Sequence, residues 1–134
     1  MSELTSSPAD GIGGVLIVED EALVAFYLED TLDELGYRCC GVADSAEEAL
    51  SLAEAESPAL AFVDVGLRGS RDGVTLAAEL MARGIGVVFL TGASDMETRR
   101  RIEAVGPHGI LAKPCNSRDI AVTLAAAQRA LAEQ

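Results

Sequence analysis

Short apolar segments alternate with longer amphipathic segments along the chain. The first apolar segment, 15–18, holds only Val, Leu and Ile, which is typical of a strand buried on both faces. Apolar side chains then recur near helical spacing over 21–35, and Gly36 provides a helix stop. Ser45 and Glu48 predict a capping box at the start of a second helix. The further expected strands are 37–42, 60–63, 86–90 and 109–112, and the further expected helices are 45–55, 74–83, 96–105 and 117–134.

This alternation of strands and helices predicts an α/β fold. The expected architecture is a parallel sheet with helices on both faces, joined by right-handed crossovers. The alternation alone does not fix the strand order. Residues 1–14 are rich in Ser, Gly and Asp and are expected to form a flexible leader, whereas residues 15–134 are expected to form one domain. No separate output domain is expected within the chain.

Composition narrows the range of functions. With 134 residues, 49% hydrophobic and 24% charged, the chain has a globular balance and can bury one core. Its formal net charge of −12 argues against direct binding to nucleic acid. No apolar run approaches the ~20 residues of a membrane helix, so no membrane association is expected. The three Cys form no CxxC pair, which argues against a zinc site and favours a cytoplasmic location.

Polar residues follow four of the expected strands. Glu19 and Asp20 follow the first strand, Asp64 the third, Thr91 the fourth and Lys113 the fifth. Ligands of open α/β sheets bind beyond the carboxyl ends of the strands, so these side chains should converge. Taken singly, four have simpler explanations: a helix cap for Asp20, a solvated edge position for Glu19, a backbone hydrogen bond for Thr91 and a surface charge for Lys113. Asp64 resists such an explanation, because an unpaired carboxylate ending an apolar run is costly.

The expected cluster suits phosphoryl chemistry with a divalent cation. Neighbouring carboxylates repel one another unless a cation lies among them, and Mg²⁺ prefers oxygen ligands. Lys113 adds a second positive charge, which can pair with a phosphoryl oxygen. A carboxylate such as Asp64 can attack phosphorus, and phosphoryl transfer mainly requires positioning and neutralisation of charge.

Four segments resemble the response-regulator receiver family of two-component systems. They are VLIVED at 15–20, FVD at 62–64, FLTG at 89–92 and AKP at 112–114. The resemblance extends from residue 15 to about residue 132. It implies a flavodoxin-like, doubly wound fold of five strand–helix units, with the five parallel strands in the order 2-1-3-4-5.

The resemblance also implies roles for individual residues. Asp64 matches the phosphoacceptor, and Mg²⁺ would be bound by Glu19, Asp20, Asp64 and the backbone carbonyl of Gly66. Thr91 matches the hydroxyl that moves to bond the phosphoryl group. The lysine that pairs with that group is matched by Lys113, and the proline that follows it in a cis peptide bond by Pro114.

Two positions depart from the family pattern. Ile110 stands where the family has a switch aromatic, three residues before the lysine, which puts the usual coupling of threonine movement to an aromatic rotation in doubt. The loop 66–73 is one residue longer than usual, and Arg68 occupies the place of a common proline four residues past the acceptor.

The resemblance implies a phosphoacceptor switch that phosphorylates and dephosphorylates itself without a turnover substrate. The expected partners are a sensor histidine kinase or a histidine phosphotransfer protein, which docks near the first helix, and a downstream protein target. That target would bind the surface of the fourth helix, fifth strand and fifth helix. The sequence does not decide whether the chain also forms a homodimer through the fourth and fifth helices. Residues 99–101 are three arginines, which form either a site for an acidic partner or a solvated face with an Arg99–Glu103 pair.

Three other functions compete with this interpretation. A degenerate receiver, acting as an interaction module without phosphorylation, would not need the complete set of acidic pair, acceptor, threonine and lysine. A haloacid-dehalogenase-type phosphatase normally carries a second Asp two residues past its nucleophile, where this chain has Gly66. A nucleotide or flavin binder is disfavoured because no GxGxxG follows the first strand and aromatic residues make up only 4%.

Overall fold

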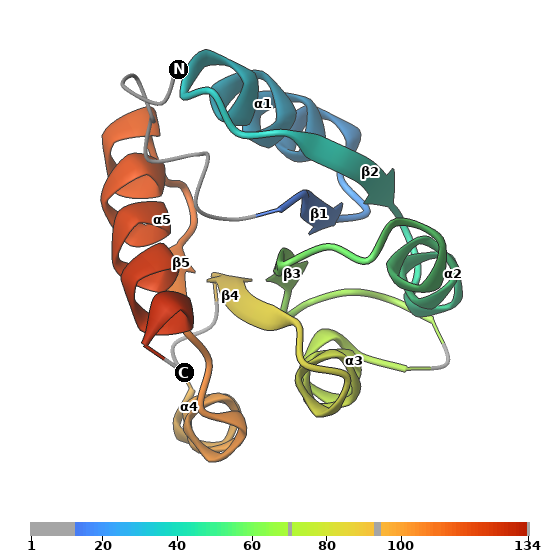
Figure 1. Ribbon diagram of the computed structural model, residues 1–134. Helices are drawn as coiled ribbons and strands as arrows, with labels where there is room; N and C mark the ends of the chain where they lie inside the picture. The colour runs from blue at the N-terminus through green and yellow to red at the C-terminus, as the bar shows by residue number, and fades with distance from the viewer. Residues whose placement is uncertain (1–12, 70, 93–94, 134) are drawn as a thin grey trace.

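A computed structural model describes residues 13–69, 71–92 and 95–133 of the chain. Most of the expected leader, 1–12, lies outside the described residues. Five strands form one sheet with helices on both sides (Figure 1). In chain order the elements are β1 (Val15–Val18), α1 (Ala22–Glu34), β2 (Cys39–Ala43), α2 (Ala46–Glu56), β3 (Leu60–Asp64), α3 (Gly73–Ala82), β4 (Gly86–Thr91), α4 (Met96–Val105), β5 (Gly109–Ala112) and α5 (Ser117–Ala132).

All neighbouring strands are parallel, and their order is β2-β1-β3-β4-β5. The doubly wound architecture predicted from the alternation, and the strand order implied by the family resemblance, are therefore confirmed. In this order β1 and β3 are adjacent in the middle of the sheet, so the residues that follow them meet at one edge. The crevice beyond the carboxyl ends of such strands is where doubly wound folds bind ligands.

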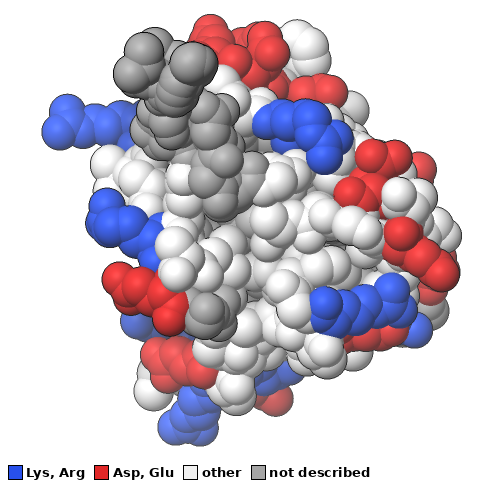
Figure 2. Space-filling model, viewed as in Figure 1, with Lys and Arg blue, Asp and Glu red and all other residues white. Residues whose placement is uncertain are grey.

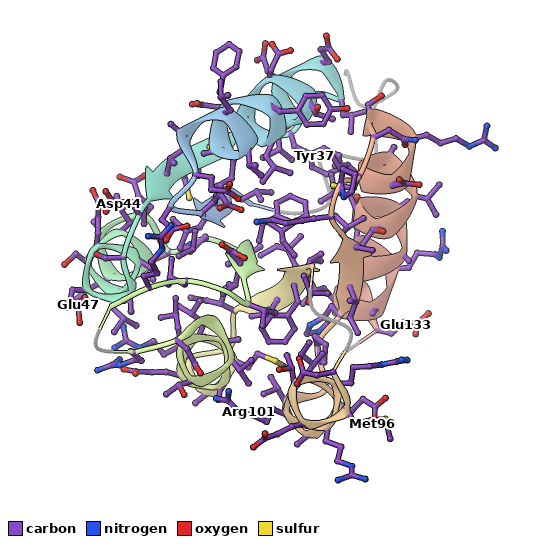
Figure 3. All side chains as sticks on the ribbon, turned by 180° about the vertical axis from the view of Figure 1, so that it is seen from behind. Tyr37, Asp44, Glu47, Met96, Arg101 and Glu133 are labelled. Carbon is purple, nitrogen blue, oxygen red and sulfur yellow. The ribbon has the colours of Figure 1, made fainter. Side chains whose placement is uncertain are left out.

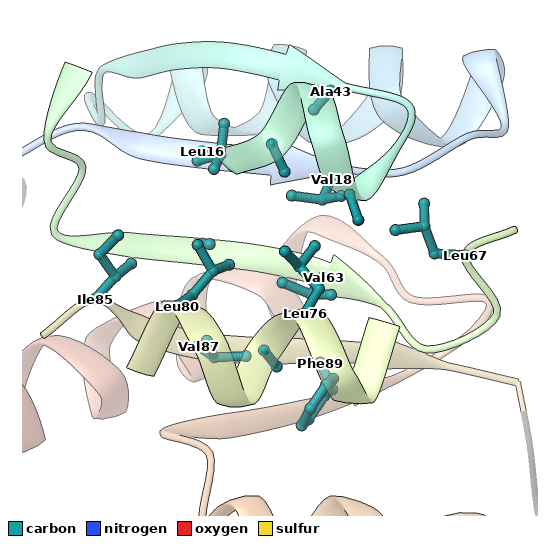
Figure 4. Packing of buried hydrophobic residues seen from close by; sticks show 14 of the residues in the cluster. Leu16, Val18, Ala43, Val63, Leu67, Leu76, Leu80, Ile85, Val87 and Phe89 are labelled. Atoms are coloured by element: carbon teal, nitrogen blue, oxygen red, sulfur yellow. The ribbon is translucent and has the colours of Figure 1, made fainter. Parts of the chain in front are cut away.

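Two hydrophobic layers hold the helices on the sheet. Val15 and Ile17 of β1 face α1 and α5, whereas Leu16 and Val18 face α2, α3 and α4. This alternation follows from the pleat of a strand, and it explains why the whole strand is apolar. The layer beneath α3 contains Leu76, Leu80 and Phe89, among others (Figure 4).

The structure corrects the start of the second strand, the start of the third helix and the capping box, and other predicted ends shift by one or two residues. The second strand begins at Cys39 rather than at 37, because the Tyr37 N–H donates to the Leu32 carbonyl in the turn after α1. The third helix begins at Gly73, one residue early, with the Asp72 carboxylate accepting from Thr75 N–H as N-cap. Glu48 accepts from Asp44 N–H rather than from its own N-cap residue, and the reciprocal capping box lies instead at the start of α5.

Gly73 fixes the start of α3 against the end of β3. A Cβ at this position would lie 2.0 Å from the backbone oxygen of Asp64, so only glycine allows this approach. The first turn of α3 is thereby packed directly on the backbone of Asp64. This contact fixes the start of α3 to the backbone of Asp64.

Many acidic side chains lie on the outer surface of the molecule (Figure 2). Figure 2 shows acidic side chains gathered over α1 and α2, at the top and right of that view. Asp44 and Glu47, at the start of α2, also lie on the outside of the molecule (Figure 3). Within the described residues no helix is both long enough and apolar enough to cross a bilayer.

Candidate functional site

The predicted strand-end residues meet at one edge of the sheet. All of them except Glu19 border a cleft of about 610 Å³, whose walls come from the ends of β1, β3, β4 and β5 and from the first turns of α3 and α4. Asp20, Asp64, Gly66, Thr91 and Lys113 all line this cleft. The sequence placed these residues at separate strand ends, and the sheet order brings them together.

Three carboxylates form the acidic centre of the site. One carboxylate oxygen each of Glu19, Asp20 and Asp64 lies within 4.8 Å of the other two. Glu19 is only 2% exposed and Asp64 only 6% exposed, so water screens their repulsion poorly. Desolvation by burial accordingly raises the pKa of Glu19, and the charge of Asp64 adds to this rise. The centre therefore needs positive charge.

Lys113 supplies part of that charge from the end of β5. Its Nζ lies 3.0 Å from Glu19 Oε1 and 3.3 Å from both Asp64 Oδ1 and Glu21 Oε1. Burial lowers the pKa of Lys113. The ion pair with Glu19 and the negative charges of Asp64 and Glu19 outweigh the effect of burial and raise the pKa of Lys113 to about 12. Lys113 is therefore a fixed cation at the centre of the site.

The remaining oxygens fit a divalent cation. Although Lys113 Nζ is close to Glu19 Oε1, this buried oxygen has no partner in hydrogen-bonding geometry among the described residues. A buried oxygen whose only polar contact within the described part of the chain is this ion pair, beside two further carboxylates, is a donor set suited to Mg²⁺. The Gly66 N–H donates to Asp64 Oδ1 at 3.0 Å, which orients that carboxylate in the cleft.

Thr91 and Lys113 line the cleft from the ends of β4 and β5. Thr91 ends β4 with 9% of its surface exposed, and its backbone carbonyl accepts from Lys113 N–H at 2.9 Å. The expected cis peptide bond between Lys113 and Pro114 is present. The hydroxyl predicted to meet a phosphoryl group and the predicted lysine are thus held in register by the β4–β5 pairing.

The two departures from the family pattern have visible positions. Ile110 is 49% exposed and borders a small hollow together with Thr91 and Ile102. The place of the switch aromatic is therefore an exposed aliphatic side chain. Arg68 points its guanidinium towards the acidic centre, with Nε 3.6 Å from Asp20 Oδ2.

The sequence analysis did not place Arg101 at the cleft. Arg101 of α4 lines the cleft and pairs with Asp72, the N-cap of α3, with its NH1 2.8 Å from Asp72 Oδ2. The order Asp72-x-x-Thr75 could have indicated the helix cap. The partnership with an arginine of the next helix depends on how α3 and α4 pack, which no local pattern reveals.

The Asp72–Arg101 pair predicts a pH dependence of stability. The hydrogen bond from Arg101 lowers the pKa of Asp72 from 3.8 to about 2, partly opposed by burial and assisted by Thr75. Because the folded pKa lies below the unfolded one, the stabilisation is present above pH 3.8 and is lost as the pH falls towards 2. Asp72→Asn keeps a good N-cap, and since Asp72 is 40% exposed we expect it to cost only ~0.5–1 kcal/mol at neutral pH.

Urea unfolding of both proteins between about pH 3 and pH 6 measures this difference. The gap in free energy of unfolding between wild type and Asp72→Asn should narrow as the pH falls through the range of carboxylate titration. A gap of constant size at every pH would show that the ion pair does not contribute to stability.

The chain is similar to a known family over most of its length. Residues 15–125 match the family model described as the response regulator receiver domain. Among curated proteins, the transcriptional regulatory protein PdtaR of Mycobacterium tuberculosis is 37% identical over 107 residues, which are 79% of this chain and 52% of that protein. The transcriptional regulatory protein AruR of Pseudomonas aeruginosa is 34% identical over 111 residues, which are 79% of this chain and 45% of that protein. The chain thus spans about half the length of these relatives.

Solved structures agree with this match. The signal receiver domain of a modulated diguanylate cyclase from Desulfovibrio desulfuricans is 40% identical, with a TM-score of 0.85 over 90% of this chain and 96% of that one. The signal receiver domain of a histidine kinase from Syntrophus aciditrophicus is 28% identical, with a TM-score of 0.80 over 91% of this chain and 94% of that one.

Proposed function

The chain belongs to the response regulator receiver domain family, and on that premise we propose that it is a phosphorylation-controlled signalling switch with Asp64 as the phosphoacceptor. The observation that carries the proposal is the position of Asp64. Its carboxylate borders an open cleft, 3.3 Å from Lys113 Nζ, with two further carboxylates within 4.8 Å. A nucleophile, a fixed cation and a cation-binding oxygen set are thereby combined at one point.

The proposed step is transfer of a phosphoryl group to Asp64 from a phosphohistidine. A carboxylate oxygen of Asp64 attacks the phosphorus, a new P–O bond forms, and the P–N bond breaks as the histidine imidazole leaves. Lys113 then pairs with the phosphoryl oxygens, and the Thr91 hydroxyl donates to one of them. Glu19, Asp20, Asp64 and the Gly66 carbonyl would hold Mg²⁺, which when bound neutralises charge on the phosphoryl group.

The proposed partners follow from the family and from the exposed apolar side chains. A sensor histidine kinase or a histidine phosphotransfer protein would dock beside the cleft, where Leu23 of α1 is largely exposed and shares a hollow with Glu21 and Lys113. A downstream protein target, or a second copy of the chain, would bind the α4–β5–α5 surface, where Met96, Ile110 and Val122 are exposed. The three cysteines are free thiols, as suits a cytoplasmic protein.

One observation favours the alternative of an interaction module that is not phosphorylated. The Arg68 guanidinium lies beside Asp20 and partly supplies the positive charge that a metal would bring. However, 87% of the Arg68 side chain is exposed, and such surface pairs contribute little. We therefore expect Mg²⁺ to displace Arg68 from Asp20.

The proposal is tested by intact mass after incubation with acetyl phosphate, with Mg²⁺ or with an excess of chelator. We expect one added phosphoryl group, which forms with Mg²⁺ and is lost on mild alkaline treatment, as an acyl phosphate should be. A parallel titration with beryllofluoride and Mg²⁺ reports whether the site accepts a phosphoryl mimic without covalent chemistry. Failure of both measurements would favour the unphosphorylated interaction module.

A further inference from the structure

Arg101 is held in a fork by the first turn of α3. Its NH1 lies 2.8 Å from Asp72 Oδ2, and its NH2 lies 3.2 Å from Asp72 Oδ1 and 3.5 Å from Thr75 Oγ1. Figure 3 shows Arg101 between α4, which carries it, and α3. A two-pronged contact of this kind is the strongest geometry for an arginine and a carboxylate.

This pair lies in the wall of the phosphoacceptor cleft. Arg101 and Asp72 border the same cleft as Asp64 and Lys113. The Arg101 side chain is 44% exposed and that of Asp72 40% exposed, so neither is locked in a packed core. A long arginine side chain can therefore exchange one anion at this cleft for another without repacking the hydrophobic layers.

The pair also connects two elements that a switch must move relative to each other. Asp72 caps α3, whose first residue, Gly73, is packed on the backbone of Asp64. Arg101 belongs to α4, whose only buried residue is Ile102. The start of α3 is thus fixed to the acceptor, whereas α4 is lightly held, and the ion pair is a polar tie between them.

We propose that Arg101 is a phosphoryl-responsive latch: it binds Asp72 while Asp64 is unmodified, and it transfers to the phosphoryl oxygens when Asp64 is phosphorylated, which releases α4 from α3. The inference rests on the proposed function and adds the residue that senses the phosphoryl group. A phosphoryl group brings roughly −1.5 to −2 charges against the single charge of Asp72, and its oxygens suit the guanidinium fork. Such a latch would connect the acceptor to α4 although position 110 holds no aromatic side chain.

The test uses beryllofluoride with Mg²⁺ as the phosphoryl mimic, so that binding is measured without phosphotransfer. Arg101→Ala should weaken beryllofluoride affinity about tenfold, as expected for loss of a charge-assisted hydrogen bond. Arg101→Lys should restore part of the affinity, because it keeps the charge but not the fork. Arg100→Ala is the matched control: the same helix loses the same charge at an exposed residue outside the cleft, and the affinity should stay within about twofold.

A second variant tests whether Arg101 exchanges Asp72 for the phosphoryl mimic or only adds positive charge to the cleft. Asp72→Asn retains the α3 cap but loosens the hold on Arg101, so beryllofluoride should bind more tightly, and this gain should shrink in the Arg101→Ala background. The Arg101 side-chain Nε–H resonance, assigned by its loss in Arg101→Ala, should shift on beryllofluoride binding in the direction that Asp72→Asn alone produces.

The outcomes separate the latch from the function on which it rests. If the wild type binds beryllofluoride while Arg101→Ala binds it equally well and the Arg101 resonance stays in place, Arg101 is a structural tie only and the latch is wrong. If the wild type binds no beryllofluoride and takes no phosphoryl group from acetyl phosphate, the proposed function and the latch both fail.

Discussion

Asp64→Asn is expected to abolish phosphoryl uptake from acetyl phosphate while leaving the fold intact. Asparagine has the shape of aspartate, and its oxygen can still accept the hydrogen bond from Gly66 N–H that orients Asp64 Oδ1. The amide lacks the anionic oxygen that, in the proposed function, would attack phosphorus, so the loss should be complete rather than partial. Intact mass in the presence of Mg²⁺ measures uptake, and circular dichroism during urea unfolding measures the fold.

Asp44→Asn is the matched control for this variant. Asp44 follows β2 at the same edge of the sheet, but it is exposed and does not border the cleft. The control makes the same change of charge and should label like the wild type. Because Asp64→Asn removes one of three clustered carboxylates, its free energy of unfolding should not fall. Labelling that persists in Asp64→Asn would place the acceptor elsewhere and overturn the assignment.

The fold was predictable because its signals are local and repeated. Each central strand is a short run of buried aliphatic residues, and each helix has apolar residues on one face, so the pattern alone separates strands from helices. The predicted start of β2, at Tyr37, was wrong because Tyr37 is buried without being part of a strand. Its hydroxyl donates to Gln128 Oε1 of α5, ninety-one residues away, and no local signal records that contact.

The site was predictable for a related reason. In a parallel sheet the carboxyl ends of the strands share one edge, so polar residues after separate strands must converge once the strands are adjacent. The order of those strands came from the resemblance, since alternation of elements fits several orders. The Glu21 contact to Lys113 and the Arg101 contact to Asp72 were missed, because they join residues of different elements, ninety-two and twenty-nine positions apart.

Lys113→Met is expected to lower the free energy of unfolding by ~2–4 kcal/mol in the absence of Mg²⁺. Methionine retains an unbranched side chain that is one heavy atom shorter, but it removes the cation from among three carboxylates. The side chain of Glu19 is fully buried and that of Asp64 is 8% exposed, so in the variant no lysine would offset the repulsion between these two carboxylates. The raised pKa of Lys113 has the same cause, because the neighbouring carboxylates favour its charged form.

Urea unfolding at several pH values, with and without Mg²⁺, measures the effect, and Arg118→Met is the control because it removes one positive charge at an exposed residue of α5. Burial raises the pKa of Glu19 above its ordinary value of 4.5, so the Glu19 carboxylate becomes charged, and destabilising, only as the pH rises above that value. The decrease in free energy of unfolding caused by Lys113→Met should therefore be smaller near pH 5 than near pH 8. Saturating Mg²⁺ should also reduce the loss, because a second cation at the carboxylates replaces part of what Lys113 supplies. If Lys113→Met unfolds like Arg118→Met under all of these conditions, the carboxylates tolerate one another without a cation, and the electrostatic account of the site would have to be abandoned.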